Sequence, residues 1–333
     1  MKVLQINSVC GIGSTGRIAT DINRILIEEG HEGYIAYGRK EPLNCSNPIR
    51  IGNKLDNYIH VIKTRILDMH GFGSIKATKR FINEIERINP DIIHLHNIHG
   101  YYINIELLFK YLKFANKPVV WTLHDCWAFT GHCSYFEYID CNKWKTMCFD
   151  CPQKRNYPAS LVKDNSKNNF IKKKELFTSI KNLTIITPSN WLAELVKESF
   201  LKIYPVKVIN NGIDLEIFKP TKSNFREKYN LKDKFIILGV ANIWDKRKGY
   251  YYFIELSNQL REDEIIIMVG VTEKQKSKLP NNIIGITRTN NIKELAEIYS
   301  ASDVFVNPTL EDNFPTTNLE ALACGTPVIT FNT

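Results

Sequence analysis

Short apolar segments alternate with amphipathic segments along most of this chain, and this alternation constrains its fold more than any other feature. Val3–Val9 is an apolar run, and in the following segment, Thr15–Glu29, the apolar residues recur with the period of a helix. The other strands expected in the first half are Tyr34–Tyr37, Asp91–Leu95, Val119–Leu123 and Thr184–Thr187. The helices expected between them are Leu55–Leu67, Lys76–Ile88, Ile105–Phe114, Asn168–Ile180 and Trp191–Leu201. Repeated strand–helix units predict an α/β fold with a parallel sheet covered by helices on both faces.

A second series of the same kind begins at Phe235–Ala241. The segment between the two series, Lys207–Lys232, contains Gly212 and Pro220 and has the composition of a connection. A chain of 333 residues is also too long for one ordinary hydrophobic core. We therefore predict two Rossmann-like domains, residues 1–217 and 218–333, that face a cleft and bind ligands at the carboxyl ends of their strands.

Charge and hydropathy limit the partners of the chain. The net charge of +9 suits an anionic ligand or an anionic membrane surface, and it is not concentrated in one arm, which argues against nucleic acid. The sequence has neither a basic segment followed by an apolar one at its start nor a run of 18 apolar residues, so we expect a cytoplasmic protein. The basic, amphipathic segment Asn53–Arg87 would suit peripheral contact with the inner face of the cytoplasmic membrane. Two helices packed on the sheet are the favoured explanation of this segment.

A glycine-rich loop follows the first expected strand. Gly11, Gly13 and Gly16 match G-x-G-x-x-G between a strand and a helix, where backbone N–H groups can approach a phosphate. The same pattern occurs in NAD(P)-binding domains, which place an acidic residue at the end of the second strand. Here that strand is followed by Arg39 and Lys40, which weakens the interpretation as an oxidoreductase and leaves it open for NADP.

Two carboxylates near the end of the chain form the most specific pattern. Asp312 and Glu320 lie eight residues apart, on a loop that runs into an expected helix, and this helix ends at Gly325 and Pro327. An acidic residue near a helix N-terminus also has a purely structural explanation, because it complements the helix dipole. The arrangement D-x7-E before EALACGTPVI resembles the E-x7-E motif of the retaining GT-B glycosyltransferases of glycosyltransferase family 4.

The resemblance implies a donor site in the second domain. Asp312 would then accept hydrogen bonds from the hydroxyl groups of the sugar near the N–H groups of Asn313 and Phe314, and Glu320 would bind the ribose. Lys248 matches the family's lysine for the donor diphosphate, and Arg247 replaces an arginine that the family usually has six residues before that lysine. A run of basic residues is otherwise typical of a solvated surface.

The resemblance assigns three further positions. Arg288 lies in the loop that contacts the nucleobase. Gly13 belongs to the loop that faces the diphosphate and the acceptor. The sequence TLH that ends at His124 matches the family's T-x-H, which places this histidine against the reacting sugar as a catalytic, positioning group. Such enzymes use no protein nucleophile and require no cofactor for catalysis, because the leaving diphosphate helps to deprotonate the acceptor.

Three histidines are clustered about 30 residues before His124. His94 and His96 alternate along an expected strand, so both side chains should leave it on the same face. With His99 they lie within six residues, which is compatible with a metal site or with buried structural histidines.

A cysteine-rich insert is predicted at residues 125–160. Five of the eight cysteines fall within 26 residues, and disulfides are rare in cytosolic proteins. The four that could bind a structural zinc ion are Cys133, Cys141, Cys148 and Cys151. Their spacing, C-x7-C-x6-C-x2-C, is irregular, and a set of buried apolar cysteines is the alternative.

The function expected from the whole pattern is transfer of a sugar from a nucleotide sugar to a glycan or lipid-linked acceptor, with retention of configuration, in the synthesis of surface polysaccharide or lipopolysaccharide. The alternatives are an NAD(P)-dependent sugar-nucleotide oxidoreductase and a non-catalytic binding protein with a GT-B fold. Members of the family continue beyond the E-x7-E helix, so the second domain is expected to be incomplete at residue 333.

Overall fold

The computed structural model describes residues 1–332 and divides the chain into two compact units, Met1–Asn210 and Asn211–Thr333. The division falls seven residues before the predicted boundary, 217 minus 210. The physical reason is that Ile213, Ile217 and Phe218 pack in the hydrophobic core of the second unit. The connection expected around these residues is thus already part of the second domain.

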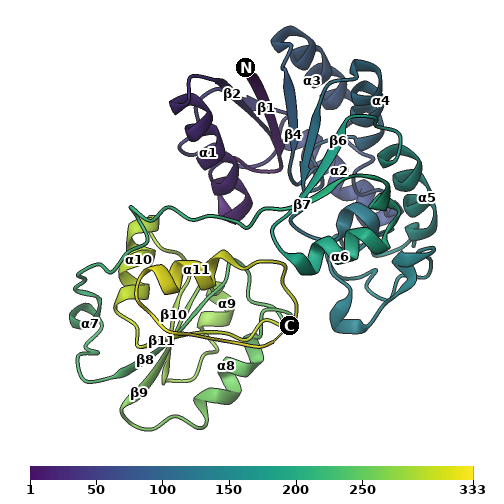
Figure 1. Ribbon diagram of the computed structural model, residues 1–333. Helices are drawn as coiled ribbons and strands as arrows, with labels where there is room; N and C mark the ends of the chain where they lie inside the picture. Colours follow the sequence, from purple (N-terminus) through teal and green to yellow (C-terminus); the bar gives the residue numbers. More distant parts are fainter. Residues whose placement is uncertain (333) are drawn as a thin grey trace. The chain divides into compact units, whose positions relative to one another are not determined.

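Seven parallel strands form the sheet of the first unit, in the order β3-β2-β1-β4-β5-β6-β7. Figure 1 labels β2, β1, β4, β6 and β7 of this sheet. The strands are β1 (Lys2–Asn7), β2 (Glu32–Tyr37), β3 (Pro48–Arg50), β4 (Ile92–Leu95), β5 (Val119–Thr122), β6 (Leu183–Thr187) and β7 (Val206–Val208). The helices are α1 (Gly13–Glu28), α2 (Lys54–Leu67), α3 (Ile75–Ile88), α4 (Ile105–Ala115), α5 (Ser166–Phe177) and α6 (Asn190–Glu198). The parallel α/β prediction is confirmed. The edge strands β3 and β7 were not predicted, because three residues are too few to show a period.

The cysteine-rich insert of the first unit contains no strand. It consists of loops and short 3-10 turns at Trp127–Phe129, Glu137–Ile139 and Lys143–Lys145. A fourth such turn, Phe200–Ile203, follows α6. Phe129, Phe136 and Trp144 are buried in the same core as the sheet residues Leu4 and Ile93. The insert is therefore part of the first unit's core and not a separate module.

The second unit repeats the architecture with five parallel strands in the order β10-β9-β8-β11-β12. The strands are β8 (Phe235–Val240), β9 (Glu264–Val269), β10 (Ile283–Ile286), β11 (Val304–Asn307) and β12 (Val328–Thr330). The helices are α7 (Phe225–Lys228), α8 (Tyr250–Ser257), α9 (Glu273–Lys276), α10 (Ile292–Ser300) and α11 (Thr316–Ala323). Ile236, Leu238 and Ile267 are fully buried, as expected for central strands with helices on both faces.

Strand order predicts where each unit binds ligands. The chain order reverses between β1 and β4 in the first sheet and between β8 and β11 in the second. In open parallel sheets, ligands bind beyond the carboxyl ends of the strands at such a switch point. The candidate residues of the first unit follow β1, β4 and β5, and most of those of the second follow β8 and β11. Among residues 1–332, no helix has the length and hydropathy needed to cross a membrane.

Candidate functional site

The glycine-rich loop of the first unit is shaped by close backbone contacts. Gly11 has a φ of +71°, and a Cβ at this position would lie 1.9 Å from the carbonyl oxygen of Leu43, so only glycine fits. Its N–H group donates to the carbonyl of Gly16 at 3.0 Å. Gly13, with a φ of +66°, is the first residue of α1, and nothing lies near its missing Cβ. The predicted Gly13 position is thus an open helix N-terminus at the end of β1.

A chain of hydrogen bonds fixes His124, which follows β5. The Gln5 amide donates to the carbonyl of Ala19 at 2.9 Å, and this bond turns the Gln5 oxygen toward His96. His96 Nε2 lies 3.0 Å from that oxygen and so carries the proton, and its Nδ1 lies 3.1 Å from His124 Nε2. His96 Nδ1 must therefore accept from His124 Nε2–H. His124 is left with an unprotonated Nδ1, which can accept a hydrogen bond from a ligand hydroxyl.

Burial keeps these histidines neutral. Burial lowers the pKa of His124 to about 4, and Asp125 opposes this effect only in part. Burial also lowers the pKa of His94 to about 4 and that of His96 well below its usual value. The rings of His94 and His96 lie 4.1 Å apart, which confirms that both leave β4 on the same face. His94 contacts Thr122 Oγ1 at 2.8 Å, as expected for a buried structural histidine.

Sequence reasoning missed a buried pair beside His124. Asp125 Oδ2 lies 2.9 Å from His99 Nε2, and both side chains are largely buried. The other carboxylate oxygen of Asp125 accepts from the backbone N–H of Trp127 at 2.9 Å. Although burial by itself would raise the pKa of Asp125, His99 and this N–H group bring it below its usual value. Tyr157 OH lies 3.2 Å from His99 Nδ1. The only hint in the sequence was that Asp125 directly follows His124.

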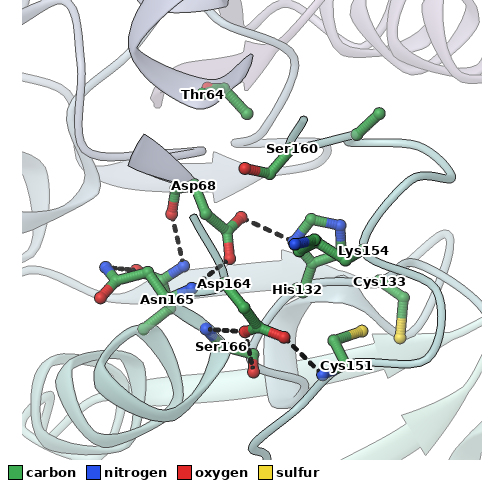
Figure 2. A network of polar contacts seen from close by, with 12 residues as sticks. Thr64, Asp68, His132, Cys133, Cys151, Lys154, Ser160, Asp164, Asn165 and Ser166 are labelled. Carbon is green, nitrogen blue, oxygen red and sulfur yellow. Dashed lines mark hydrogen bonds and ion pairs between the residues drawn. The ribbon is translucent and has the colours of Figure 1, made fainter. Parts of the chain in front are cut away.

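The predicted zinc cysteines share one cavity. Cys133, Cys141, Cys148 and Cys151 line it together with His132. His132 Nδ1 lies 2.6 Å from Asp68 Oδ1, and Asp164 accepts from the N–H of Cys151 at 2.6 Å (Figure 2). All eight cysteines are free. Within residues 1–332, however, no group of three or more His, Cys, Asp or Glu side chains is arranged to hold a metal ion. This finding applies to the three clustered histidines as well, and the zinc site stays a prediction.

A lysine–carboxylate pair lies at the switch point of the second unit. Lys248 Nζ contacts Asp312 Oδ2, and about a fifth of each side chain or less is exposed. Lys248 belongs to the loop between β8 and α8, and Asp312 to the loop between β11 and α11. The loops meet closely at Gly249, whose φ is +76° and whose missing Cβ would lie 2.4 Å from the carbonyl oxygen of Pro308. Lys248 and Asp312 are both predicted site residues, and they are separated by 64 positions in the sequence, 312 minus 248. The structure brings them into contact.

The neighbours of this pair include three other predicted residues. Arg247 donates to the carbonyl of Glu311 at 2.9 Å, which ties the same two loops together. The N–H of Asn313 donates to Asp312 Oδ1 at 2.9 Å. The carbonyl of Phe314 accepts from the Asn211 side chain at 3.4 Å. Arg247 thus stabilises the loops, and Lys248 is the cation that meets the carboxylate.

Two further predicted residues, Glu320 and Arg288, have neighbours other than Lys248 and Asp312. Glu320 is almost completely buried in α11, and the Tyr299 hydroxyl donates to its Oε2 at 3.2 Å. The sequence gave no sign of this tyrosine partner. Arg288 follows β10 and lines a pocket of about 540 Å³ together with Lys276 and Tyr229. Neither Lys248 nor Asp312 lines that pocket.

Comparisons with known proteins agree with the fold. The model for Glycosyltransferase Family 4 matches residues 15–217, and the one for Glycosyl transferases group 1 matches residues 234–333. The putative colanic acid biosynthesis glycosyl transferase WcaC of Escherichia coli K12 is 25% identical over 348 residues, which cover 99% of this chain and 82% of that protein. An Escherichia coli UDP-Gal:alpha-D-GlcNAc-diphosphoundecaprenol alpha-1,3-galactosyltransferase is 31% identical over 153 residues, which cover 41% of this chain and 39% of that protein.

Solved structures show the same architecture. Sucrose-phosphate synthase from Thermosynechococcus elongatus superimposes with a TM-score of 0.72 at 17% identity, over 99% of this chain and 81% of that one. Anabaena Alr3699/HepE in complex with UDP and glucose gives 0.65 at 14% identity, over 99% and 80%. The predicted GT-B class is therefore confirmed, with a Rossmann-like sheet in each unit. The family model matches residues 15–217, which are 203 of the 333 residues. This chain therefore belongs to Glycosyltransferase Family 4.

Proposed function

We propose that this glycosyltransferase moves a hexosyl group from a nucleotide sugar to a glycan or lipid-linked acceptor, with retention of configuration, in the synthesis of a surface polysaccharide. Family membership supports a glycosyl transfer reaction. The name of WcaC supports the biosynthetic setting, and the name of the galactosyltransferase supports a diphosphoundecaprenol-linked acceptor.

The contact between Lys248 and Asp312 at the β8/β11 switch point carries the proposal. A cation and a carboxylate held side by side offer one group for an anionic diphosphate and one for sugar hydroxyls. We assign the diphosphate to Lys248, with Arg247 holding the loop, and the sugar to Asp312 and the N–H groups of Asn313 and Phe314. Glu320 is assigned to the ribose, and Arg288 to the nucleobase.

The first unit would supply the acceptor side. His124 is neutral at pH 7 and, in the tautomer fixed by His96, presents Nδ1 as a hydrogen-bond acceptor for a sugar hydroxyl. It positions the reacting groups and does not carry a proton through the reaction. The leaving diphosphate, held by Lys248, takes the proton of the acceptor hydroxyl, so no metal or cofactor is required for the chemistry.

A panel of nucleotide sugars tests this function directly. We expect the purified protein to hydrolyse slowly, or to transfer, the sugar of at least one UDP- or GDP-hexose, measured by release of the nucleoside diphosphate. An absorbance change with NAD(P)H and no diphosphate release would instead support an oxidoreductase. Tight nucleotide-sugar binding without release would support a non-catalytic binding protein.

We further propose that Cys133, Cys141, Cys148 and Cys151 bind a structural zinc ion. The four thiols share one cavity in a loop region that has no strand to hold it, which is where a metal gives most stability. We expect about one zinc per chain by elemental mass spectrometry of the purified protein. The Cys148→Ser variant should lose the metal, and the control Cys324→Ser, at a buried cysteine of the second unit, should keep it. Wild-type protein that is folded and free of zinc would contradict the proposal.

A further inference from the structure

Helix α2 has the reverse of the usual burial pattern of a surface helix. Its fully buried residues, His60 and Thr64, are polar. Most of its exposed residues are apolar: Leu55 is 64% exposed, Tyr58 63% and Ile66 47%. A surface helix of a globular domain normally buries its apolar face. The exposed face of α2 therefore requires an explanation other than packing within the unit.

The inward face of α2 is specified by hydrogen bonds. The N–H groups of Gly71 and Gly73 both donate to His60 Nε2 at 3.2 Å. His60 Nδ1 lies 2.9 Å from Ser74 Oγ, and the Thr64 hydroxyl donates to the His60 carbonyl at 3.0 Å. Rotating the helix to bury its apolar residues would break the contacts of His60 with Gly71, Gly73 and Ser74. The hydrogen bonds of His60 thus fix the outward orientation of the apolar residues.

Five of the exposed apolar residues of α2 form one continuous strip. At about 100° per residue, Leu55, Tyr58, Ile59, Ile62 and Ile66 fall within an arc of about 100°, opposite His60 and Thr64. A neighbouring loop extends the strip, because the N–H of Leu161 donates to the Arg65 carbonyl at 2.7 Å and the N–H of Lys163 donates to the Ile66 carbonyl at 3.1 Å. In that loop Leu161 and Val162 are also exposed. We call these seven apolar residues the α2 surface.

Basic residues border the α2 surface on both sides. On the helix, Lys54 and Arg65 fall on one side of the strip and Lys63 on the other. Lys163 follows Val162 and is exposed. The acidic residue on α2, Asp56, is engaged in the N-terminal capping box and lies 3.5 Å from Arg80. The rim is therefore positively charged.

We propose that the α2 surface binds the interface of an anionic membrane. An apolar strip flanked by lysine and arginine is the arrangement of helices that lie in the plane of a bilayer interface, and lipid phosphates would meet the basic rim. The other helix of the predicted membrane segment, α3, buries Ala77, Phe81 and Ile85 and is a structural helix. The membrane contact thus falls on α2 and the adjoining loop.

Vesicle sedimentation tests the proposal without any measurement of activity, so its outcome is independent of the proposed function. The probes are vesicles of phosphatidylcholine alone and of phosphatidylcholine mixed with phosphatidylglycerol. We expect wild-type protein to bind the mixed vesicles and the double variant Ile62→Gln/Ile66→Gln to bind them at least about tenfold more weakly, because two apolar side chains no longer enter the lipid. Both positions are exposed and glutamine favours helices, so the variant should fold, which circular dichroism checks.

Two further variants make the test specific. Phe114→Gln on α4 removes a side chain that is 89% exposed, and its vesicle affinity should equal that of wild type. Lys54→Glu/Lys63→Glu should lose the preference for anionic vesicles. Equal binding of wild type and Ile62→Gln/Ile66→Gln, or equal binding of wild type to both vesicle types, would overturn the proposal. A concentration-dependent dimer that Ile62→Gln/Ile66→Gln abolishes, with no vesicle binding, would show that the surface serves a second copy of the chain instead.

Discussion

Lys248→Ala is expected to lower kcat/KM for the nucleotide sugar by roughly 10²–10³-fold, the effect of removing one electrostatic group from a polar catalytic site. In the proposed mechanism the lysine neutralises the diphosphate as it leaves, so its contribution is larger in the transition state than in the bound ground state. Nucleoside diphosphate release, measured at several donor concentrations, gives kcat and KM separately. We expect kcat to fall more than the affinity for the donor.

Lys246→Ala is the matched control for this prediction. It removes the same charge from an exposed position two residues earlier in the same loop and should leave kcat/KM within about threefold of wild type, since exposed charges interact weakly in water. Asp312→Asn should lower kcat by a factor similar to that of Lys248→Ala. Because the two side chains are in contact, the double variant should be less impaired than the product of the single effects. Wild-type turnover in Lys248→Ala would refute the role assigned to this lysine.

Acid should destabilise the first unit strongly, because it contains several buried neutral histidines. Burial lowers the pKa of His60 to about 3 and the pKa values of His94 and His124 to about 4, and it lowers those of His70 and His96 as well. A histidine with a lowered pKa in the folded state binds its proton in the unfolded state first. The stability that it contributes is therefore complete above the unfolded pKa of about 6.5 and is lost as the pH falls toward the folded pKa.

The size of this effect follows from the shifts. A pKa lowered from 6.5 to about 4 corresponds to roughly 3 kcal/mol for His94 alone, at about 1.4 kcal/mol per unit. His132 works in the opposite direction: although burial lowers its pKa, its contact with Asp68 raises it above the usual value overall. The histidines with lowered pKa outnumber it, so the free energy of unfolding should fall by several kcal/mol between about pH 7 and about pH 4.

Urea unfolding at a series of pH values measures this loss. His94→Gln retains a polar partner for Thr122 and removes one titrating group, so its free energy of unfolding should depend less steeply on pH than that of wild type. The comparison uses the change in the free energy of unfolding with pH within each protein. A loss of stability that the substitution causes equally at every pH therefore cancels. Equal slopes for His94→Gln and wild type, or a wild-type stability that does not change down to about pH 4, would contradict the prediction.

Much of the fold could be predicted because it is encoded locally. The sequence pattern predicts the apolar strand Val3–Val9 and the amphipathic helix Thr15–Glu29, and the structure differs from these bounds by no more than two residues at either end. The strand β3 was missed because three residues show no period. The position of the domain boundary depended on which core Ile217 and Phe218 join, and this is a property of packing.

In the candidate sites, too, some features could be predicted from the sequence and others could not. Lys248, Asp312 and His124 could be named because their motifs resemble those of the family, and each residue follows a strand at the carboxyl edge of a sheet. The side chains that contact Glu320 and Asp125 could not be predicted in this way. These partners, Tyr299 and His99, come from other segments of the chain. The tautomer of His124 depends on Gln5, which lies 119 positions away, 124 minus 5.

The sequence by itself determined the α/β class, the two domains and the chemical type of the candidate residues, because hydrophobic period and motif spacing are local properties of a chain. Only the tertiary structure decided which of these residues meet, which histidines are neutral and which face of α2 points outward. Those outcomes depend on burial and on hydrogen bonds between distant segments. His60 shows the reason: its contacts with the N–H groups of Gly71 and Gly73 turn the apolar residues of α2 toward the solvent, which hydrophobic period alone would have placed in the core.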